Sequence, residues 1–286
     1  MRITEPQNDT YIVDVNSWGE LLDKAENGLP STNRGRSSRK ENNLEFSGTK
    51  TFGEAVIFAK RGWPEQAKKI ALNSSRLFAK TKSWVSYQEK IEYAVCGHSI
   101  DIAKFVEGEP ECVMEIGYQK GSGSNKKRII KIDIPFSYSW QLTPEEILKH
   151  GSRVVALIQL VEFSGYNTYI QASSYKRNSY SNSRKIGIHF PLKLPDQPLD
   201  LNRIAFALCH PSFLRRIFFS FEETLPKKIV ESIGFNLDSD YGESIGYKAE
   251  LTTYQPDLAI ENLTKNSGIT SDEAWLKGKI EQLKVL

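Results

Sequence analysis

Apolar residues recur with helical spacing in the middle of the chain. Positions i, i+3, i+4 and i+7 are apolar at Val154, Leu157, Ile158 and Val161, which places these side chains on one helix face. The preceding Thr-Pro-Glu-Glu at 143–146 combines a capping box with proline at the first helical position. Gly165 suits the end of the helix. The pattern therefore predicts a long helix from Pro144 to Gly165.

The same capping logic locates further helices. A Ser or Thr followed three residues later by Glu occurs at 17–20, 51–54 and 270–273, and Pro64 suits the first turn of another helix. The segment from Leu201 to Phe221 also has helical periodicity, interrupted at Pro211. We expect helices beginning near residues 17, 51, 64, 201 and 270.

Three short β-rich runs surround the long helix. They cover residues 129–134, 168–172 and 185–190, and residues 256–261 have the character of a final strand. The order from Arg128 to about Phe221 is strand, helix, hairpin, helix. This alternation predicts an α/β fold: a mostly parallel sheet with helices on both faces, and with the hairpin placing an antiparallel strand at one edge.

Polar segments divide the chain into two predicted parts. Residues 31–45 are polar and aperiodic, which predicts a mobile basic loop, and residues 121–128 are rich in Gly, Ser and Lys. We predict a mainly helical N-terminal region at 1–120 and an α/β domain at 121–286. The 286 residues allow one large domain or two smaller ones.

The composition indicates the cellular compartment in which we expect the protein, but it does not indicate a reaction. Three widely spaced cysteines indicate neither a disulfide framework nor a zinc site, and a reducing compartment fits them best. No apolar run approaches the roughly 18 residues that span a bilayer, and the N-terminus has no apolar leader segment. We expect a cytoplasmic protein with no membrane partner. None of the common phosphate-loop, dinucleotide, zinc-protease or nucleophile-elbow motifs is present.

One acidic-serine loop lies where the first predicted strand turns toward the long helix. Asp133, Ser137 and Ser139 offer oxygen ligands at a strand end, where α/β sheets place ligands. The element order resembles the von Willebrand factor A-like domain from about residue 128 to 221. That family's metal motif is Asp-x-Ser-x-Ser, whereas this chain has Asp-x-x-x-Ser-x-Ser. The resemblance implies Mg²⁺ at these residues; ordinary strand-end polar residues, with no cofactor, are the alternative.

Basic residues gather in four segments, although the net charge is only +3. Aromatic residues accompany several of them, among them Trp63, Phe78, Trp84, Tyr175 and Tyr180. Lys and Arg beside exposed aromatics are typical of surfaces that follow a nucleic-acid backbone, although solvated helix faces have the same composition. The candidate residues are Arg34, Arg36, Arg39 and Lys40; Lys60, Arg61, Lys68, Lys69, Arg76, Lys80 and Lys82; Lys126, Lys127, Arg128 and Lys131; and Lys176, Arg177, Arg184 and Lys185.

Four further stretches resemble an uncharacterised protein family of bacteriophages and other mobile elements. They are FSGTKTFGEA at 46–55, RGWP at 61–64, VEGEPECVM at 106–114 and LDLNRIAFALCHPSFLRR at 199–216. The resemblance would span from about Trp18 to Leu286. It implies a viral or mobile-element protein in a bacterial cytoplasm or virion, and it transfers no catalytic residues.

Two functional interpretations follow. The first is a non-enzymatic interaction protein whose basic loops contact nucleic acid or an acidic protein partner. The second is a metal-dependent enzyme of phosphoryl transfer or nuclease type that uses Asp133 together with Asp238, Asp240 or Asp257, since paired carboxylates can hold two metal ions.

Overall fold

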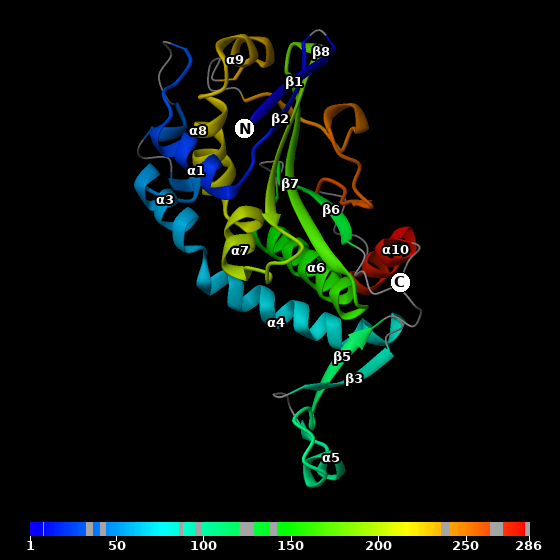
Figure 1. Ribbon diagram of the computed structural model, residues 1–286. Coiled ribbons are helices and arrows are strands. Elements are labelled where there is room, and N and C mark those ends of the chain that lie inside the picture. The colour runs from blue at the N-terminus through cyan, green and yellow to red at the C-terminus, as the bar shows by residue number, and fades with distance from the viewer. Residues whose placement is uncertain are drawn as a thin grey trace.

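A mixed β-sheet forms the centre of the computed structural model, which describes residues 1–7, 9–32, 37–40, 44–85, 88–94, 99–119, 129–137, 142–235, 241–263 and 271–283 (Figure 1). The strand order is β1-β2-β8-β7-β6-β10, and β9 pairs with β7. The strands are β1 (Arg2–Gln7), β2 (Thr10–Asp14), β6 (Ile129–Pro135), β7 (Asn167–Asn178), β8 (Ser181–Lys193), β9 (Glu243–Ser244) and β10 (Leu258–Ala259).

This sheet contains both parallel and antiparallel pairs. β6 is parallel to β7 and β10, and β2 is parallel to β8, whereas β7–β8, β1–β2 and β7–β9 are antiparallel. The predicted α/β class is confirmed, and β1 is an antiparallel edge strand. The edge position expected for the hairpin is wrong, because β2 pairs along the outer side of β8, from Thr10↔Lys185 to Asp14↔His189.

Helices pack around the sheet, and the predicted caps are present. Ser17 accepts the Glu20 amide, Thr51 accepts the Glu54 amide, and Thr143 forms both hydrogen bonds of its capping box. Among the described residues, no helix combines the length and apolar character needed to cross a bilayer. The helices of the main body include α1 (Trp18–Asn27), α2 (Leu44–Ser47), α3 (Phe52–Arg61), α4 (Pro64–Thr81), α6 (Pro144–Phe163), α7 (Leu201–Cys209), α8 (Phe219–Glu222), α9 (Lys227–Ile233) and α10 (Asp272–Leu283).

The two faces of the sheet differ in chemistry because side chains alternate along each strand. One face is apolar: the Phe190 ring on β8 lies 5.9 Å from Trp18 and 5.8 Å from Phe213, between centroids. The other face carries Asp133, Gln171, Ser173, Tyr175 and His189, all buried. Figure 1 shows helices α1, α7 and α8 beside the apolar face.

A C-terminal segment covers the polar face at close range. Its 3-10 turn Ala249–Leu251 lies on β8, where a Cβ at Gly187 would come within 2.0 Å of the Leu251 carbonyl oxygen. The Tyr247 ring lies 5.7 Å from the Tyr175 ring between centroids. Only glycine at 187 permits this approach.

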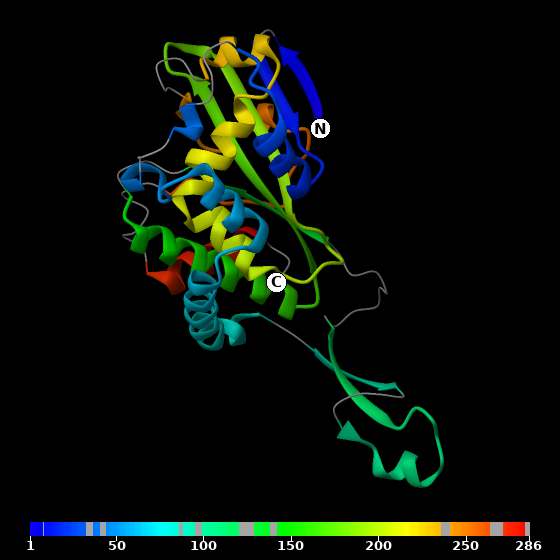
Figure 2. The same ribbon diagram turned by 90° about the vertical axis from the view of Figure 1, so that its left-hand side faces the viewer.

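Residues 88–94 and 99–119 contain a separate three-stranded sheet, which projects from the main body (Figures 1 and 2). It consists of β3 (Gln88–Ala94), β4 (Ser99–Ile100) and β5 (Val113–Gln119), with the short helix α5 (Ile102–Val106). The first 120 residues thus supply helices, this small sheet, and strands β1 and β2 of the main sheet. A domain boundary near residue 120 stays a prediction.

A buried ion pair joins the sheet to helix α8. Lys176 on β7 donates to both carboxylate oxygens of Glu222, at 2.7 and 2.8 Å, and the two side chains are 3% and 0% exposed. Burial raises the pKa of Glu222 to about 7, although the Lys176 ammonium opposes this shift. The folded protein therefore holds this proton more tightly than the unfolded chain does.

Arg216 provides a second buried anchor, and its role was not foreseen from the sequence. Its guanidinium donates to the carbonyl oxygens of Lys40 at 3.1 Å, Thr49 at 2.9 Å and Lys50 at 3.1 Å, and its side chain is 1% exposed. One side chain thus ties the backbone at Lys40, Thr49 and Lys50 to the helical layer.

We expect Glu222→Gln to change the pH dependence of stability. The raised pKa means that Glu222 contributes stability that is fully present below pH 4.5 and is lost as the pH rises through 7. The unfolding free energy of the wild type, relative to that of the variant, should fall over this interval in urea titrations. Glu281→Gln, at an exposed position of α10, is the matched control, and the change for Glu222→Gln should exceed the change for this control. A flat difference for Glu222→Gln would contradict the prediction.

We expect Arg216→Lys to lower the unfolding free energy by about 2–4 kcal/mol, because an ammonium cannot reach the carbonyl groups that the guanidinium fork serves. Urea denaturation measures the loss. Arg203→Lys, on a partly exposed helix position, should cost less than about 1 kcal/mol. Equal losses in the two variants would show that Arg216 is not a special anchor.

Candidate nucleic-acid interface

Helix α4 is strictly amphipathic. It begins at Pro64, and its buried residues are Gln66, Ala67, Ile70, Ser74, Leu77 and Thr81. These positions form one stripe that packs against α6 and α7. At 3.6 residues per turn, the remaining positions point away from the body. The exposed face of α4 is therefore set by the same periodicity that fixes its core face.

Basic residues occupy that exposed face. Lys68, Lys69, Arg76 and Lys80 are all exposed and lie within about 120° of the helix circumference. Among the described residues, Lys68, Lys69 and Arg76 form no ion pair, whereas Lys80 lies 3.3 Å from Glu273. An 18-residue helix is about 27 Å long. The three residues without an ion pair, from Lys68 to Arg76, span about 12 Å of this length, and the exposed Glu65 is an acidic residue on the same face.

An exposed aromatic side chain follows the basic face. Trp84 ends the 3-10 turn η2 (Lys82–Trp84) and is 41% exposed. Other aromatics near this cluster pack internally: the Phe78 ring lies 5.3 Å from Phe163, and Trp63 lies 4.5 Å from His210, between centroids. Trp84 is thus the aromatic beside α4 that a base could stack on.

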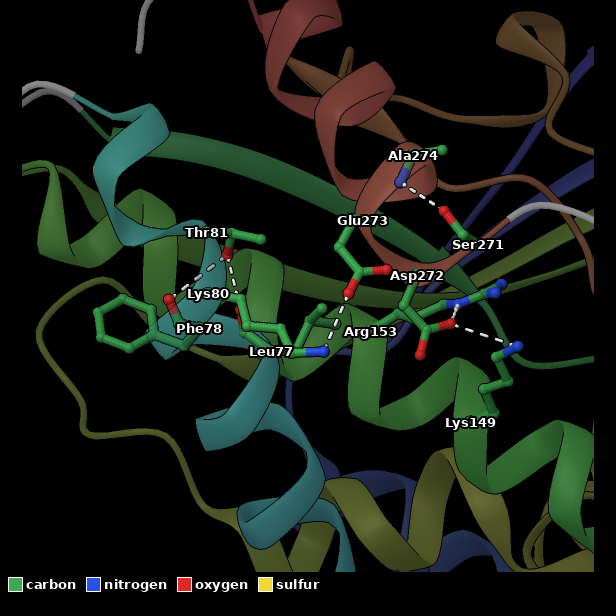
Figure 3. Close-up of polar contacts among 10 residues, drawn as sticks. All are labelled: Leu77, Phe78, Lys80, Thr81, Lys149, Arg153, Ser271, Asp272, Glu273 and Ala274. Carbon is green, nitrogen blue, oxygen red and sulfur yellow. Dashed lines mark hydrogen bonds and ion pairs between the residues drawn. The ribbon is translucent and has the colours of Figure 1, made fainter.

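A cleft of about 330 Å³ lies between α4, α6 and the start of α10. Ion pairs hold α10 here: Lys80 of α4 contacts Glu273, while Arg153 and Lys149 of α6 contact Asp272 at 2.5 and 3.4 Å (Figure 3). The acidic first turn of α10 neutralises this margin of the basic face. The charge without an ion pair lies toward the N-terminal end of α4, at Lys68 and Lys69.

The residues predicted for nucleic-acid contact in the 31–45 loop are described in part. Arg39 donates to the Ala25 carbonyl at 2.7 Å and lies 4.3 Å from the Phe52 ring centroid, so it packs against the body. Lys40 is exposed. Arg34 and Arg36 lie outside the described residues.

The hairpin residues are engaged inside the protein. Lys176 is buried against Glu222, so its charge faces the core. Arg177 forms a bidentate pair with Glu243, at 2.8 and 2.9 Å. Lys126, Lys127 and Arg128 lie outside the described residues. Of the other described candidates, Lys60, Arg184 and Lys185 form ion pairs with Glu26, Asp9 and Glu250, whereas Lys68, Lys69 and Arg76 lie together on α4 without one.

Asp133 and Ser137, two of the three predicted Mg²⁺ residues, have separate hydrogen-bond partners. Asp133 is fully buried and accepts hydrogen bonds from Ser173 at 2.7 Å and Tyr175 at 2.9 Å. Burial raises the pKa of its carboxyl. Ser137 instead contacts Ser174, which is on the opposite face of β7, at 2.8 Å between hydroxyl oxygens. Ser139 lies outside the described residues.

The carboxylates of the alternative enzyme hypothesis do not meet Asp133 in the described part of the chain. Asp257 accepts the backbone N–H of Lys131 at 2.9 Å, and Asp238 and Asp240 lie outside the described residues. Within those residues, no three His, Cys, Asp or Glu side chains are grouped closely enough to hold a metal ion. Sequence reasoning missed the partners of Asp133; the alternation of Gln171, Ser173 and Tyr175 along β7 was their signal.

Comparisons with known proteins give a family but no activity. No curated protein and no solved structure matches the chain. A family model described as a domain of unknown function, DUF7192, matches residues 3–285. The match covers the sheet, its helices and the projecting segment together, and on this evidence the chain belongs to the DUF7192 family.

Proposed function

We propose that this protein is a nucleic-acid-binding interaction protein and that the exposed face of α4 is its contact surface. The single observation that carries this proposal is the row of exposed basic side chains on α4, of which Lys68, Lys69 and Arg76 have no acidic partner among the described residues. Positive charge along one face supports binding to a phosphate backbone by counterion release.

The surroundings of α4 favour a single strand as the ligand. Trp84 offers an exposed indole at the end of the basic face, and base stacking on an aromatic ring is typical of single-strand binding. Leu72, 54% exposed, lies between the basic residues and adds apolar contact area. An acidic protein partner would use the charge but would gain less from an isolated indole.

The biological setting is proposed on the resemblance of residues 46–55 and 199–216 to bacteriophage and mobile-element proteins. We place the protein in a bacterial cytoplasm or virion, with a von Willebrand factor A-like core that serves as a scaffold. The Rossmann-like arrangement of β6, α6 and β7 is compatible with that core. No arrangement in the described residues favours the enzyme hypothesis over this one.

We expect the triple variant Lys68→Gln, Lys69→Gln, Arg76→Gln to bind single-stranded DNA or RNA at least tenfold more weakly than the wild type at about 100 mM salt. Removing three phosphate contacts should also reduce the slope of log affinity against log salt by about 2. Fluorescence anisotropy of a labelled oligonucleotide across a salt series measures both quantities.

The matched control removes the same number of exposed positive charges elsewhere: Lys50→Gln, Lys227→Gln, Lys248→Gln. Its affinity should stay within about twofold of the wild type. Equal losses in the two variants would show that only net charge matters. Absence of wild-type binding at 50 mM salt would remove the proposal altogether.

We expect Trp84→Ala to weaken single-strand binding by about 1–3 kcal/mol while leaving the salt slope unchanged, because stacking releases no counterions. Tyr180→Ala, at the exposed tip of the β7–β8 hairpin, is the control and should have no effect. A changed slope with unchanged affinity at low salt would contradict a stacking role for Trp84.

A further inference from the structure

A cavity of about 460 Å³ opens on the polar face of the main sheet. This volume lies in the range of small-molecule sites. Two tyrosine rings line it, Tyr169 and Tyr254, with centroids 5.8 Å apart, and Leu194 and Pro195 add apolar surface. The cavity therefore offers flat aromatic walls, with polar side chains of β7 and β8 among its lining.

His189 lines this cavity, and its Nδ1 faces a carboxylate. His189 Nδ1 lies 3.2 Å from an Asp14 carboxylate oxygen, and the other Asp14 oxygen accepts the Thr253 hydroxyl at 2.9 Å. Burial raises the pKa of Asp14, but the hydrogen bonds from His189 and Thr253 outweigh it, so the pKa is lowered. The ionised carboxylate requires the proton on Nδ1. In the neutral imidazole, Nε2 is then a hydrogen-bond acceptor.

Three buried polar atoms of the cavity's own residues lack a hydrogen-bond partner among the described residues. They are His189 Nε2, Gln171 Nε2 and the Tyr254 hydroxyl. The Gln171 amide lies close enough to Asp133 to oppose, in small part, the rise in the Asp133 pKa that burial causes. The contact of Nε2 nevertheless falls outside ordinary hydrogen-bond geometry. An unsatisfied buried group costs roughly 1–3 kcal/mol. Three at one cavity indicate a place that a polar ligand completes.

The three atoms specify complementary hydrogen bonding. Gln171 Nε2 donates, His189 Nε2 accepts, and the tyrosine hydroxyl does either. A ligand that serves them needs a donor and an acceptor on one rigid edge, and the tyrosine rings suit a planar body. A nucleobase combines these features: protein pockets read its hydrogen-bonding edge and stack on its faces.

The cavity also has a cation at its margin. Lys131 is exposed, and its ammonium lies 5.2 Å from the Tyr254 ring centroid. No described acidic side chain forms an ion pair with it. Lys131 is therefore placed to meet a phosphate attached to a base that stacks on Tyr254.

We propose that this cavity binds the base of a single nucleoside or nucleotide. The ring stacks on Tyr254 and meets Tyr169 edge to face, since the two tyrosine planes are inclined by 67°; its edge satisfies Gln171 and His189, and a 5′-phosphate contacts Lys131. Because the unpaired atoms are closed to solvent, the side chains that cover them move aside when the base edge reaches them, while the Tyr254 ring keeps its place. The site lies on the polar face of the sheet, whereas α4 belongs to the helical layer, so it does not depend on the α4 interface.

Isothermal titration calorimetry of the full chain with the four common ribonucleosides and their 5′-monophosphates tests the proposal. We expect at least one base to bind with a dissociation constant below about 1 mM, and its monophosphate to bind more tightly. Gln171→Met, which keeps the side-chain volume but removes the donor, should weaken binding at least tenfold. Lys131→Gln should abolish the preference for the monophosphate.

Two controls make the outcomes decisive. Tyr180→Ala should bind as the wild type does, and so should the α4 triple variant, which separates this site from the oligonucleotide surface. Thermal unfolding of each variant without ligand shows that the fold is intact. No binding by any of these probes, unchanged binding by folded Gln171→Met, or loss of binding in the α4 variant would each overturn the proposal.

Discussion

Burial of β7 on both faces is the constraint on which the rest of the structure depends. On the apolar side, Lys176 must be neutralised, and Glu222 reaches it from α8. On the other side, Asp133 takes two donors from β7 itself, Ser173 and Tyr175. A buried charge without a partner costs several kcal/mol, so the Lys176–Glu222 pair favours one position of α8 on β7, and the Asp133 contacts favour the pairing of β6 with β7.

Much of the local structure follows from the sequence, whereas the long-range pairing does not. Capping at Thr143 and periodicity from Val154 to Val161 suffice to place α6, because both signals are local. The pairing of β2 with β8 joins residues about 175 positions apart, and no local pattern encodes it. Even Gly187, whose missing side chain admits the Leu251 carbonyl, looks in the sequence like an ordinary strand glycine.

The candidate nucleic-acid interface was also only partly predictable from the sequence. The exposed face of α4 could be predicted, since helical spacing alone separates Lys68 and Arg76 from the buried stripe. The ion pairs of Lys176 and Arg177 could not be predicted, because their acidic partners lie 46 and 66 residues away in the sequence. Clusters of basic residues in a sequence therefore overstate the basic surface, and tertiary ion pairs decide which charges remain available.

The buried polar atoms of Gln171 and His189 beside the cavity lack hydrogen-bond partners among the described residues, and this lowers the free energy of unfolding. Apolar residues at 171 and 189 would pack this face without unsatisfied atoms and would stabilise the chain. The chain instead has Gln171 and His189 at these positions. Asp14 contacts the imidazole, and Thr253 holds the Asp14 carboxylate in place. A polar arrangement that costs stability and fixes one tautomer has the character of a binding site, in which the missing hydrogen bonds come from the ligand.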